Sequence, residues 1–225
     1  LGMRWMGVLF AIFLLIAYGL IFNSVQANSV SRALTFAFDI PPLFSGIALA
    51  IVSLLVIVGG IKGVARLMQW FVPMMALLWV GSSIIICLWH IGHLPDIIVT
   101  IIKSAFGWQE AAAGAAGYTL SQAIANGFQR GMFSNEAGMG STPNAAASAA
   151  SWPPHPAAQG IVQMIGVLGD TLVVCTASAM IILLAGNGTS YVPMEGIQLL
   201  QKAMVTLTGE WGAGFVAFIV ILFAF

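Results

Sequence analysis

The sequence predicts an all-α polytopic membrane protein, and three observations support this prediction. Hydrophobic residues make up 60% of the 225 residues and charged residues only 6%, whereas charged residues make up about 25% of a soluble domain. The mean hydropathy is +1.01. Several apolar runs approach the roughly 20 residues that a helix needs to cross a bilayer. The seven basic and seven acidic residues balance, so nothing indicates the basic face of a nucleic-acid-binding protein.

Six apolar segments divide the chain, which we treat as a single transmembrane domain over residues 1–225. The approximate spans are 5–37, 45–60, 67–89, 118–150, 159–185 and 212–225. The chain opens at Leu1 rather than at an initiator methionine, and the last apolar run reaches Phe225 after about 14 residues, fewer than a span needs. We therefore expect a fragment of a longer membrane protein, with a truncated last helix.

The segments between the spans have different characters. "HLPDIIVTIIKSAFGWQE" (93–110) is short and amphipathic with three charged residues besides its histidine, which favours a surface or re-entrant helix. "SWPPHP" (151–156) is a loop, because consecutive prolines cannot continue a helix. After the "GNG" that ends the fifth span, a polar stretch leads to Trp211 and the last apolar run.

The fourth span cannot be one continuous helix. Three glycines, each costing up to about 1 kcal/mol of helix stability relative to alanine, interrupt it at Gly131, Gly138 and Gly140. Pro143 suits the first turn of a new helix. We expect a half-helix over 118–133, an unwound hinge over 134–140 and a second half-helix over 142–150.

A break of this kind predicts a binding site. Irregular backbone at membrane depth is tolerated only where it is buried in protein or lines a wet cavity, and its free amides and carbonyls bind carboxylates and cations in transporters. Glu136 lies in the hinge, and a charged residue at this depth is a functional hypothesis by default. Two interpretations stay open for Glu136: a ligand or ion contact, or a structural pair with Arg130.

Two other helices carry polar residues at depth. Asn23 and Gln26 are three positions apart and share a helix face, where they either reach a polar substrate or bond a neighbouring helix. In the fifth span, Gln159, Gln163, Gly166 and Asp170 recur on one face. Asp170 lies about 16 Å along the axis from Gln159 at 1.5 Å per residue. It is either functional or the partner of an interhelical hydrogen bond or of a cation such as Arg130.

Enzyme chemistry is not indicated. The chain shows no nucleophile–base pair, phosphate loop or CxxC motif, and its three histidines lack metal-ligand spacing. We assign no catalytic residue and no metal ligand. Cys87 and Cys175 lie inside apolar runs and are interpreted as buried free thiols.

The broken span and its neighbours resemble a known family. "RGMFSNEAGMGSTPNAAASAA" (130–150) resembles the signature of the alanine or glycine:cation symporter family, N-E-A-G-x-G-S followed by a small residue and proline. "HPAAQGIVQMIGVLGDTLVVCTASAMIILLAG" (155–186), "FNSVQANS" and "GGIKGVAR" are similar to further segments of its members. The resemblance covers essentially the whole chain. Many members carry a histidine three residues after the proline, where this chain has Ala146.

The resemblance implies a function and a fold. Members couple uptake of alanine or glycine, a small neutral amino acid, to a sodium gradient by alternating access. We therefore expect a multi-pass protein of the bacterial inner membrane, with sodium as coupling ion and no cofactor. The implied fold is LeuT-type, with two inverted repeats, of which the chain would hold the third to eighth core helices. The oligomeric state stays open.

The resemblance also implies site residues. One substrate contact would come from the first span and the others from the broken one: Gln26, Phe133, Ser134, Asn135, Glu136 and Gly138. Sodium ligands would lie mainly in core helices outside the chain. Alternatives are an ion channel or a proton-coupled amino-acid carrier. An intramembrane enzyme or a structural subunit fits the polar residues less well.

Overall fold

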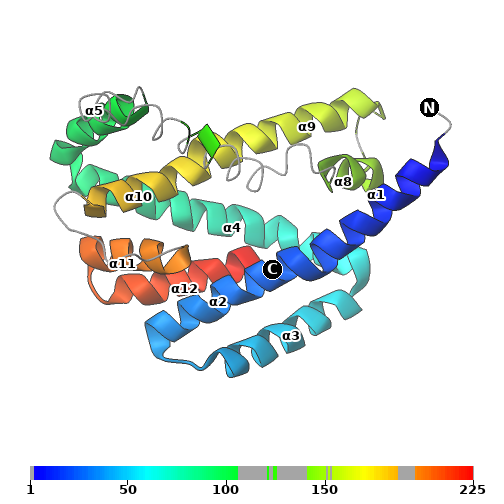
Figure 1. The fold of residues 1–225 in the computed structure, drawn as a ribbon, viewed down its shortest axis with the longest axis horizontal. Coiled ribbons are helices and arrows are strands. Elements are labelled where there is room, and N and C mark those ends of the chain that lie inside the picture. Colours follow the sequence, from blue (N-terminus) through cyan, green and yellow to red (C-terminus); the bar gives the residue numbers. More distant parts are fainter. Residues whose placement is uncertain are drawn as a thin grey trace. The chain divides into compact units, whose positions relative to one another are not determined.

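The computed structural model describes residues 3–105, 121, 124–125, 141–150, 152, 154–186 and 196–224. These residues are mainly helical, and no strand occurs among them (Figure 1). The prediction of an all-helical protein is therefore confirmed for the described part of the chain. The half-helix over 118–133 falls almost wholly outside the described residues, and the hinge over 134–140 entirely so.

The described helices fall into two compact units, residues 1–88 with 177–225 and residues 89–176. Their bounds are α1 (Arg4–Ile16), the π-helix η1 (Ala17–Phe22), α2 (Asn23–Phe38), α3 (Pro42–Val58), α4 (Gly60–Trp89), the 3₁₀ turn η2 (Ile91–His93), α5 (Leu94–Ala105), α8 (Ser141–Ser148), α9 (Pro156–Gly169), the π-helix η3 (Asp170–Cys175), α10 (Thr176–Gly186), α11 (Ile197–Thr208) and α12 (Trp211–Ala224).

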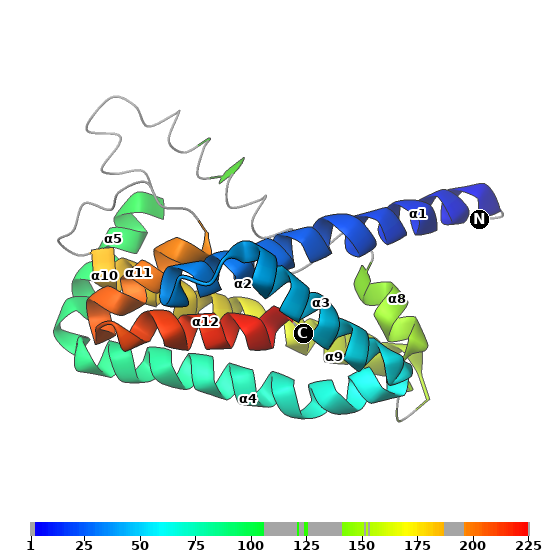
Figure 2. The ribbon, with the colours of Figure 1, turned by 90° about the horizontal axis from the view of Figure 1, so that it is seen from below.

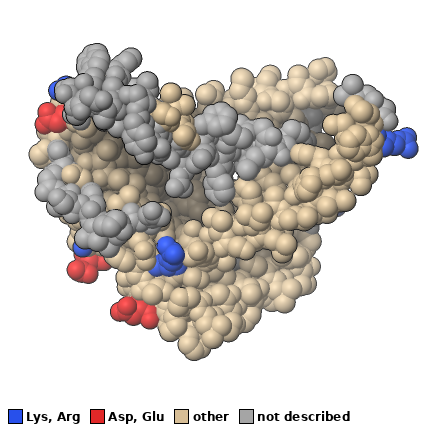
Figure 3. Space-filling model, in the orientation of Figure 1, with Lys and Arg blue, Asp and Glu red and all other residues tan. Residues whose placement is uncertain are grey.

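Three helices in the described residues are long and apolar enough to cross a membrane. They are Arg4–Phe38, Lys62–Trp89 and Pro156–Gly186, and the apolar helices α3 and α12 are shorter. Their large side chains lie on the surface: Leu15 is 73% exposed and Leu77 is 74% exposed. Uncharged residues dominate the face drawn in Figure 3, with few charged groups. Such surfaces are typical of helices that lipid, rather than a protein core, covers.

A tight corner joins α2 to α3. Asp39 ends α2 in the left-handed conformation, at a φ of 54°, and its N–H donates to Thr35 O at 3.0 Å. Pro42 then stands at the first turn of α3, where its missing N–H costs nothing. Beyond the corner, the buried Ser45 hydroxyl donates to Ser31 Oγ at 3.0 Å. The two helices form the hairpin seen in Figure 1.

The best-packed core lies between α2, α11 and α12. Its fully buried side chains include Val30, Ala33, Met204, Val216 and Ala217. The turn between α11 and α12 uses Gly209, whose φ of 91° suits glycine and whose N–H donates to Val205 O at 2.8 Å. This core fixes the position of the C-terminal half of α2, the helix whose other end carries Asn23 and Gln26.

Two hydrogen bonds join α4 to α10 within the first unit. Trp79 Nε1 donates to Ser178 Oγ at 3.1 Å, and the buried Ser83 hydroxyl donates to Ala177 O at 3.2 Å. Polar side chains bridging helices in this way are common in membrane bundles. The long helix α4 is seen along its length in Figure 2.

The second unit holds the amphipathic segment. Helix α5 buries Ile97 and exposes Asp96 and Lys103 near its two ends. Helix α9 begins directly after the proline loop, where His155 Nδ1 accepts the N–H of Ala157 at 3.1 Å and caps the helix.

The helices differ from the expected segments in two places. Helix α4 begins at Gly60 rather than at 67, so the basic "GGIKGVAR" lies at its start; a helix can extend beyond the apolar window that predicts it. The polar stretch before Trp211 contains α11. The apolar residues of α11 recur at helical spacing, and two of them, Ala203 and Met204, are buried. The apolar stripe of α11 is too short to predict a membrane span, and the polar residues between the apolar ones obscured the helical pattern.

Candidate functional site

Two π-helical turns interrupt the two longest apolar helices. In the first, η1, the ring of Tyr18 stacks on Phe22 with centroids 4.7 Å apart. Polar side chains directly after the turn donate back into it: Asn23 Nδ2 to Gly19 O at 3.3 Å and Ser24 Oγ to Leu20 O at 2.6 Å. A π turn loosens the regular i→i−4 ladder, and such turns occur often at functional sites.

The second π turn, η3, begins at Asp170 and follows the same pattern. Thr176, the residue directly after it, donates its hydroxyl to Thr171 O at 3.4 Å. Cys175 Sγ lies 3.9 Å from Asp170 Oδ2 and donates to it. Both turns thus place a polar side chain next to backbone carbonyls inside a long apolar helix.

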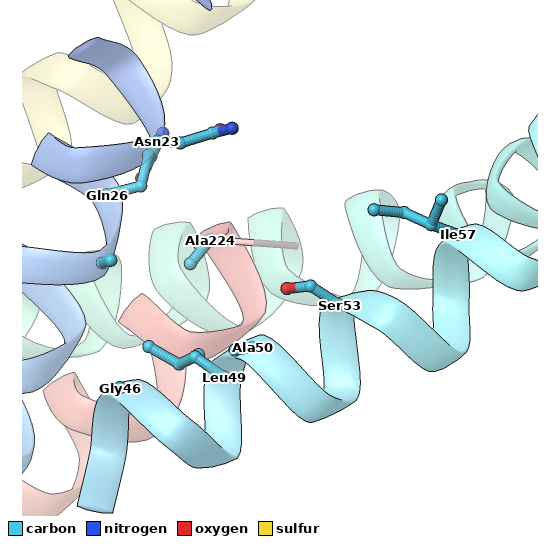
Figure 4. A pocket seen from close by; sticks show the side chains of 9 residues that line it. Asn23, Gln26, Gly46, Leu49, Ala50, Ser53, Ile57 and Ala224 are labelled. Atoms are coloured by element: carbon cyan, nitrogen blue, oxygen red, sulfur yellow. The ribbon is translucent and has the colours of Figure 1, made fainter. Parts of the chain in front are cut away.

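A pocket of about 320 Å³ lies beside the first π turn, within the first unit. It is bounded by α2, α3 and the C-terminal end of α12 (Figure 4). The lining residues are Asn23, Gln26, Ala27, Gly46, Leu49, Ala50, Ser53, Ile57 and Ala224. Its polar groups are two amides and one hydroxyl, and Figure 4 shows the Ser53 hydroxyl directed from α3 into the space. Ligand pockets typically hold a few such polar groups in an apolar wall.

The two amides of the pocket differ in their hydrogen bonding. Asn23 uses its amide nitrogen within its own helix, on Gly19 O. No hydrogen bond holds the Gln26 side chain to another described residue. Of the two, Gln26 therefore has its donor and its acceptor available to a ligand.

Of the predicted substrate contacts, only Gln26 lies in the described part of the chain. The other five, and the possible partner Arg130, lie outside the described residues: Phe133, Ser134, Asn135, Glu136 and Gly138. The structure adds Ser53, which no sequence pattern singled out. No local signal distinguishes Ser53, because α3 carries a second serine, Ser45, which lies outside the pocket.

A second pocket, of about 720 Å³, lies between α8 and α9 in the second unit. Small alanine and glycine residues form most of its wall, together with His155 and Gln159. The His155 side chain is already engaged in capping α9. Among the described residues, no group of three His, Cys, Asp or Glu side chains could hold a metal ion.

Comparison with known proteins identifies the family. The model of the sodium:alanine symporter family matches residues 1–225. An uncharacterized transporter of Escherichia coli, YaaJ, is 74% identical over the whole chain, which covers 47% of that protein. The probable sodium/glutamine symporter GlnT of Bacillus subtilis is 43% identical over the whole chain, which covers 46% of it.

A third relative is archaeal. The sodium/alanine symporter AgcS of Methanococcus maripaludis is 40% identical over 181 residues, which are 80% of the chain and 39% of that protein. The chain thus spans about half the length, or less, of these relatives. The chain belongs to the sodium:alanine symporter family, whose members are membrane transporters that move amino acids with sodium.

Proposed function

We propose that the protein carrying this chain takes up alanine or glycine together with sodium by alternating access. The observation that carries the proposal is the pocket beside η1, where the Gln26 amide faces a space of about 320 Å³. This volume lies near the lower end of the roughly 300–1,000 Å³ of ligand pockets, which suits a substrate with a small side chain.

Gln26 has the chemistry for an amino acid. Its amide offers an N–H donor to a carboxylate and a carbonyl acceptor to an ammonium group, the two charged ends of a zwitterion. The surrounding wall is apolar apart from Asn23 and Ser53, so few other side chains compete for the polar ends of the substrate. A methyl or hydrogen side chain needs no further polar partner.

The names of relatives support amino-acid substrates but differ in detail. One relative is a sodium/alanine symporter and another a probable sodium/glutamine symporter. The substrate side chain thus varies within the family. We propose alanine or glycine because the pocket is small and because the broken-span signature of this chain matches the alanine or glycine pattern.

We also propose a fold and a cellular location for the protein. A LeuT-type inverted-repeat architecture, with the hinge over 134–140 lining the substrate path, would explain the glycines and Pro143 in an apolar segment. Phe133 and the hinge residues Ser134, Asn135, Glu136 and Gly138 would complete the substrate contacts. Sodium would be the coupling ion with no cofactor, and the bacterial inner membrane the location.

The test is uptake of labelled alanine and glycine by the full-length protein in proteoliposomes. An inward sodium gradient should drive accumulation above the external concentration, and its removal should abolish it. Accumulation that follows a proton gradient without sodium would overturn sodium coupling and support the proton-coupled carrier. Sodium flux at channel-like rates, without accumulation of either amino acid, would support the ion channel instead.

A further inference from the structure

We propose that the Asp170 carboxylate at the start of η3 is a ligand of the coupling cation, a monovalent sodium ion. This inference rests on the proposed sodium-coupled function and names a site for the ion in this chain. It depends on three observations: the depth of Asp170 in an apolar helix, the π turn that begins there, and the ligand chemistry of the oxygen atoms on that stretch of helix.

Depth is the first observation. Asp170 lies near the middle of the apolar helix Pro156–Gly186, whose hydropathy averages 2.2 over its most apolar window. It is half-buried, and its helical neighbours Leu168 and Leu172 are exposed. An ionised carboxylate at such a place is expensive and marks an ion or substrate path by default.

The π turn is the second observation. In a regular α-helix, residues five apart point to different sides, because each residue advances about 100°. The wider π turn brings position i+5 back toward position i. Two side chains reach back over five positions here, Cys175 to Asp170 Oδ2 and Thr176 to Thr171 O. The turn thus brings the Cys175 thiol to the Asp170 carboxylate, and the hydroxyls of Thr171 and Thr176 lie on the same short length of helix.

The ligand chemistry is the third observation. Carboxylate, hydroxyl and carbonyl oxygens suit hard cations and not the softer transition metals. No cluster of three His, Cys, Asp or Glu occurs in the described residues. One carboxylate neutralises one positive charge, so a monovalent ion leaves the site neutral in a low-dielectric surrounding, whereas a divalent ion would leave an uncompensated charge.

The competing interpretation is structural. Asp170 could serve only to hold a neighbouring helix through a hydrogen bond or a cationic side chain. That role would make Asp170 necessary for folding and leave the sodium dependence of transport unchanged in any variant that folds. The two interpretations therefore differ in a measurable property of the folded protein.

The first experiment measures alanine uptake by the full-length protein against sodium concentration. Asp170→Asn keeps the size of the side chain and removes its charge. We expect the half-saturating sodium concentration to rise at least tenfold, with alanine affinity restored at high sodium. The matched control Asp96→Asn removes an exposed carboxylate on α5 and should leave the sodium curve in place. An unchanged curve in folded Asp170→Asn overturns the proposal.

The second experiment retains Asp170 and measures the reactivity of the neighbouring Cys175 thiol. In a full-length background where Cys175 is the one remaining cysteine, a small membrane-permeant maleimide labels the thiol that lies 3.9 Å from Asp170 Oδ2. Sodium should slow labelling at least threefold relative to choline, without any amino acid present. A background that retains Cys87 of α4 instead should show no sodium effect.

The two experiments separate this proposal from the proposed function. Equal labelling of Cys175 in sodium and choline overturns the Asp170 site even if sodium-driven alanine uptake is found. A sodium effect on Cys175 labelling supports the site even if alanine and glycine prove not to be the substrates. Acidification slows labelling of any thiol because the thiolate is the nucleophile. A larger slowing at Cys175 than at Cys87, with no effect of sodium, would therefore assign the carboxylate to a proton and overturn the sodium site.

Discussion

Gln201 of α11 donates its buried side-chain N–H to Ala33 O of α2 at 3.0 Å, joining residues 168 positions apart in the chain. The same nitrogen donates to Ala213 O of α12 at 3.1 Å. One fully buried amide therefore ties three helices together. Its Oε1 accepts no hydrogen bond from the described residues.

The Gln201 contact predicts an order of stabilities. Gln201→Leu loses both donated hydrogen bonds but also removes the unsatisfied Oε1, so we expect a net loss of about 1 kcal/mol. Gln201→Glu places carboxylate oxygen against two carbonyls, and we expect a larger loss of several kcal/mol. Thermal unfolding of the full-length protein in detergent measures both.

The control for this series is Gln198→Leu, at a half-buried glutamine of the same helix. It should change the midpoint of unfolding by less than Gln201→Leu. If Gln201→Glu is as stable as Gln201→Leu, the two carbonyl contacts do not hold the helices together.

The Trp79–Ser178 hydrogen bond predicts a coupling between α4 and α10. Trp79→Phe and Ser178→Ala should each destabilise the protein, and together by less than the sum. The coupling free energy should be about 0.5–1.5 kcal/mol, the usual net value of one hydrogen bond. Trp89→Phe, at a side chain 82% exposed, serves as the control and should show no coupling with Ser178→Ala. Strict additivity of Trp79→Phe and Ser178→Ala would argue against the bond.

Close packing at Gly212 predicts intolerance of a single methyl group. A Cβ there would lie 2.5 Å from Thr208 Oγ1 and 3.0 Å from Met204 O, so α11 and α12 would have to separate. We expect Gly212→Ala to cost about 1–3 kcal/mol. Gly81→Ala in α4 meets nothing within 4 Å and should be neutral or slightly stabilising. Equal stability of the two variants would contradict the packing.

The pocket predicts a selective effect on transport. Gln26→Leu removes both polar contacts to the substrate, and we expect the KM for alanine uptake to rise about 10–100-fold, corresponding to about 1.5–3 kcal/mol. Asn28→Leu removes an exposed amide of the same helix outside the pocket and should leave the KM within twofold. Similar values for the two variants would assign Gln26 to a role outside the substrate pocket.

The sequence could predict the helices because the apolar runs are long and the breaks carry Pro and Gly. It could not predict the π turns, since "AYGLIF" and "DTLVVC" contain nothing that separates them from ordinary helix. The residue directly after each turn is more informative, because Asn23 and Thr176 are polar and donate back into it.

The site was only partly predictable for a related reason. The three-residue spacing of Asn23 and Gln26 indicated a shared face, and both line one pocket. Ser53 and Gln201 gain their meaning from helices that lie far away in the chain, so no local pattern reveals them. A glutamine on an amphipathic helix such as α11 is typical of a surface, yet tertiary packing buries Gln201 completely.

A small amino acid that binds beside Gln26 in a sodium-coupled carrier should protect a thiol on the facing wall of the pocket, and cysteine labelling detects this protection. The Ser53→Cys variant of the full-length protein, otherwise free of cysteine, places a thiol on the opposite wall of the pocket. Ser29→Cys, at a half-buried serine of α2 outside the pocket, is the matched control. Alanine with sodium should slow maleimide labelling of Ser53→Cys and not of Ser29→Cys, and neither solute alone should suffice. Labelling of Ser53→Cys at the same rate with and without alanine and sodium would contradict the account.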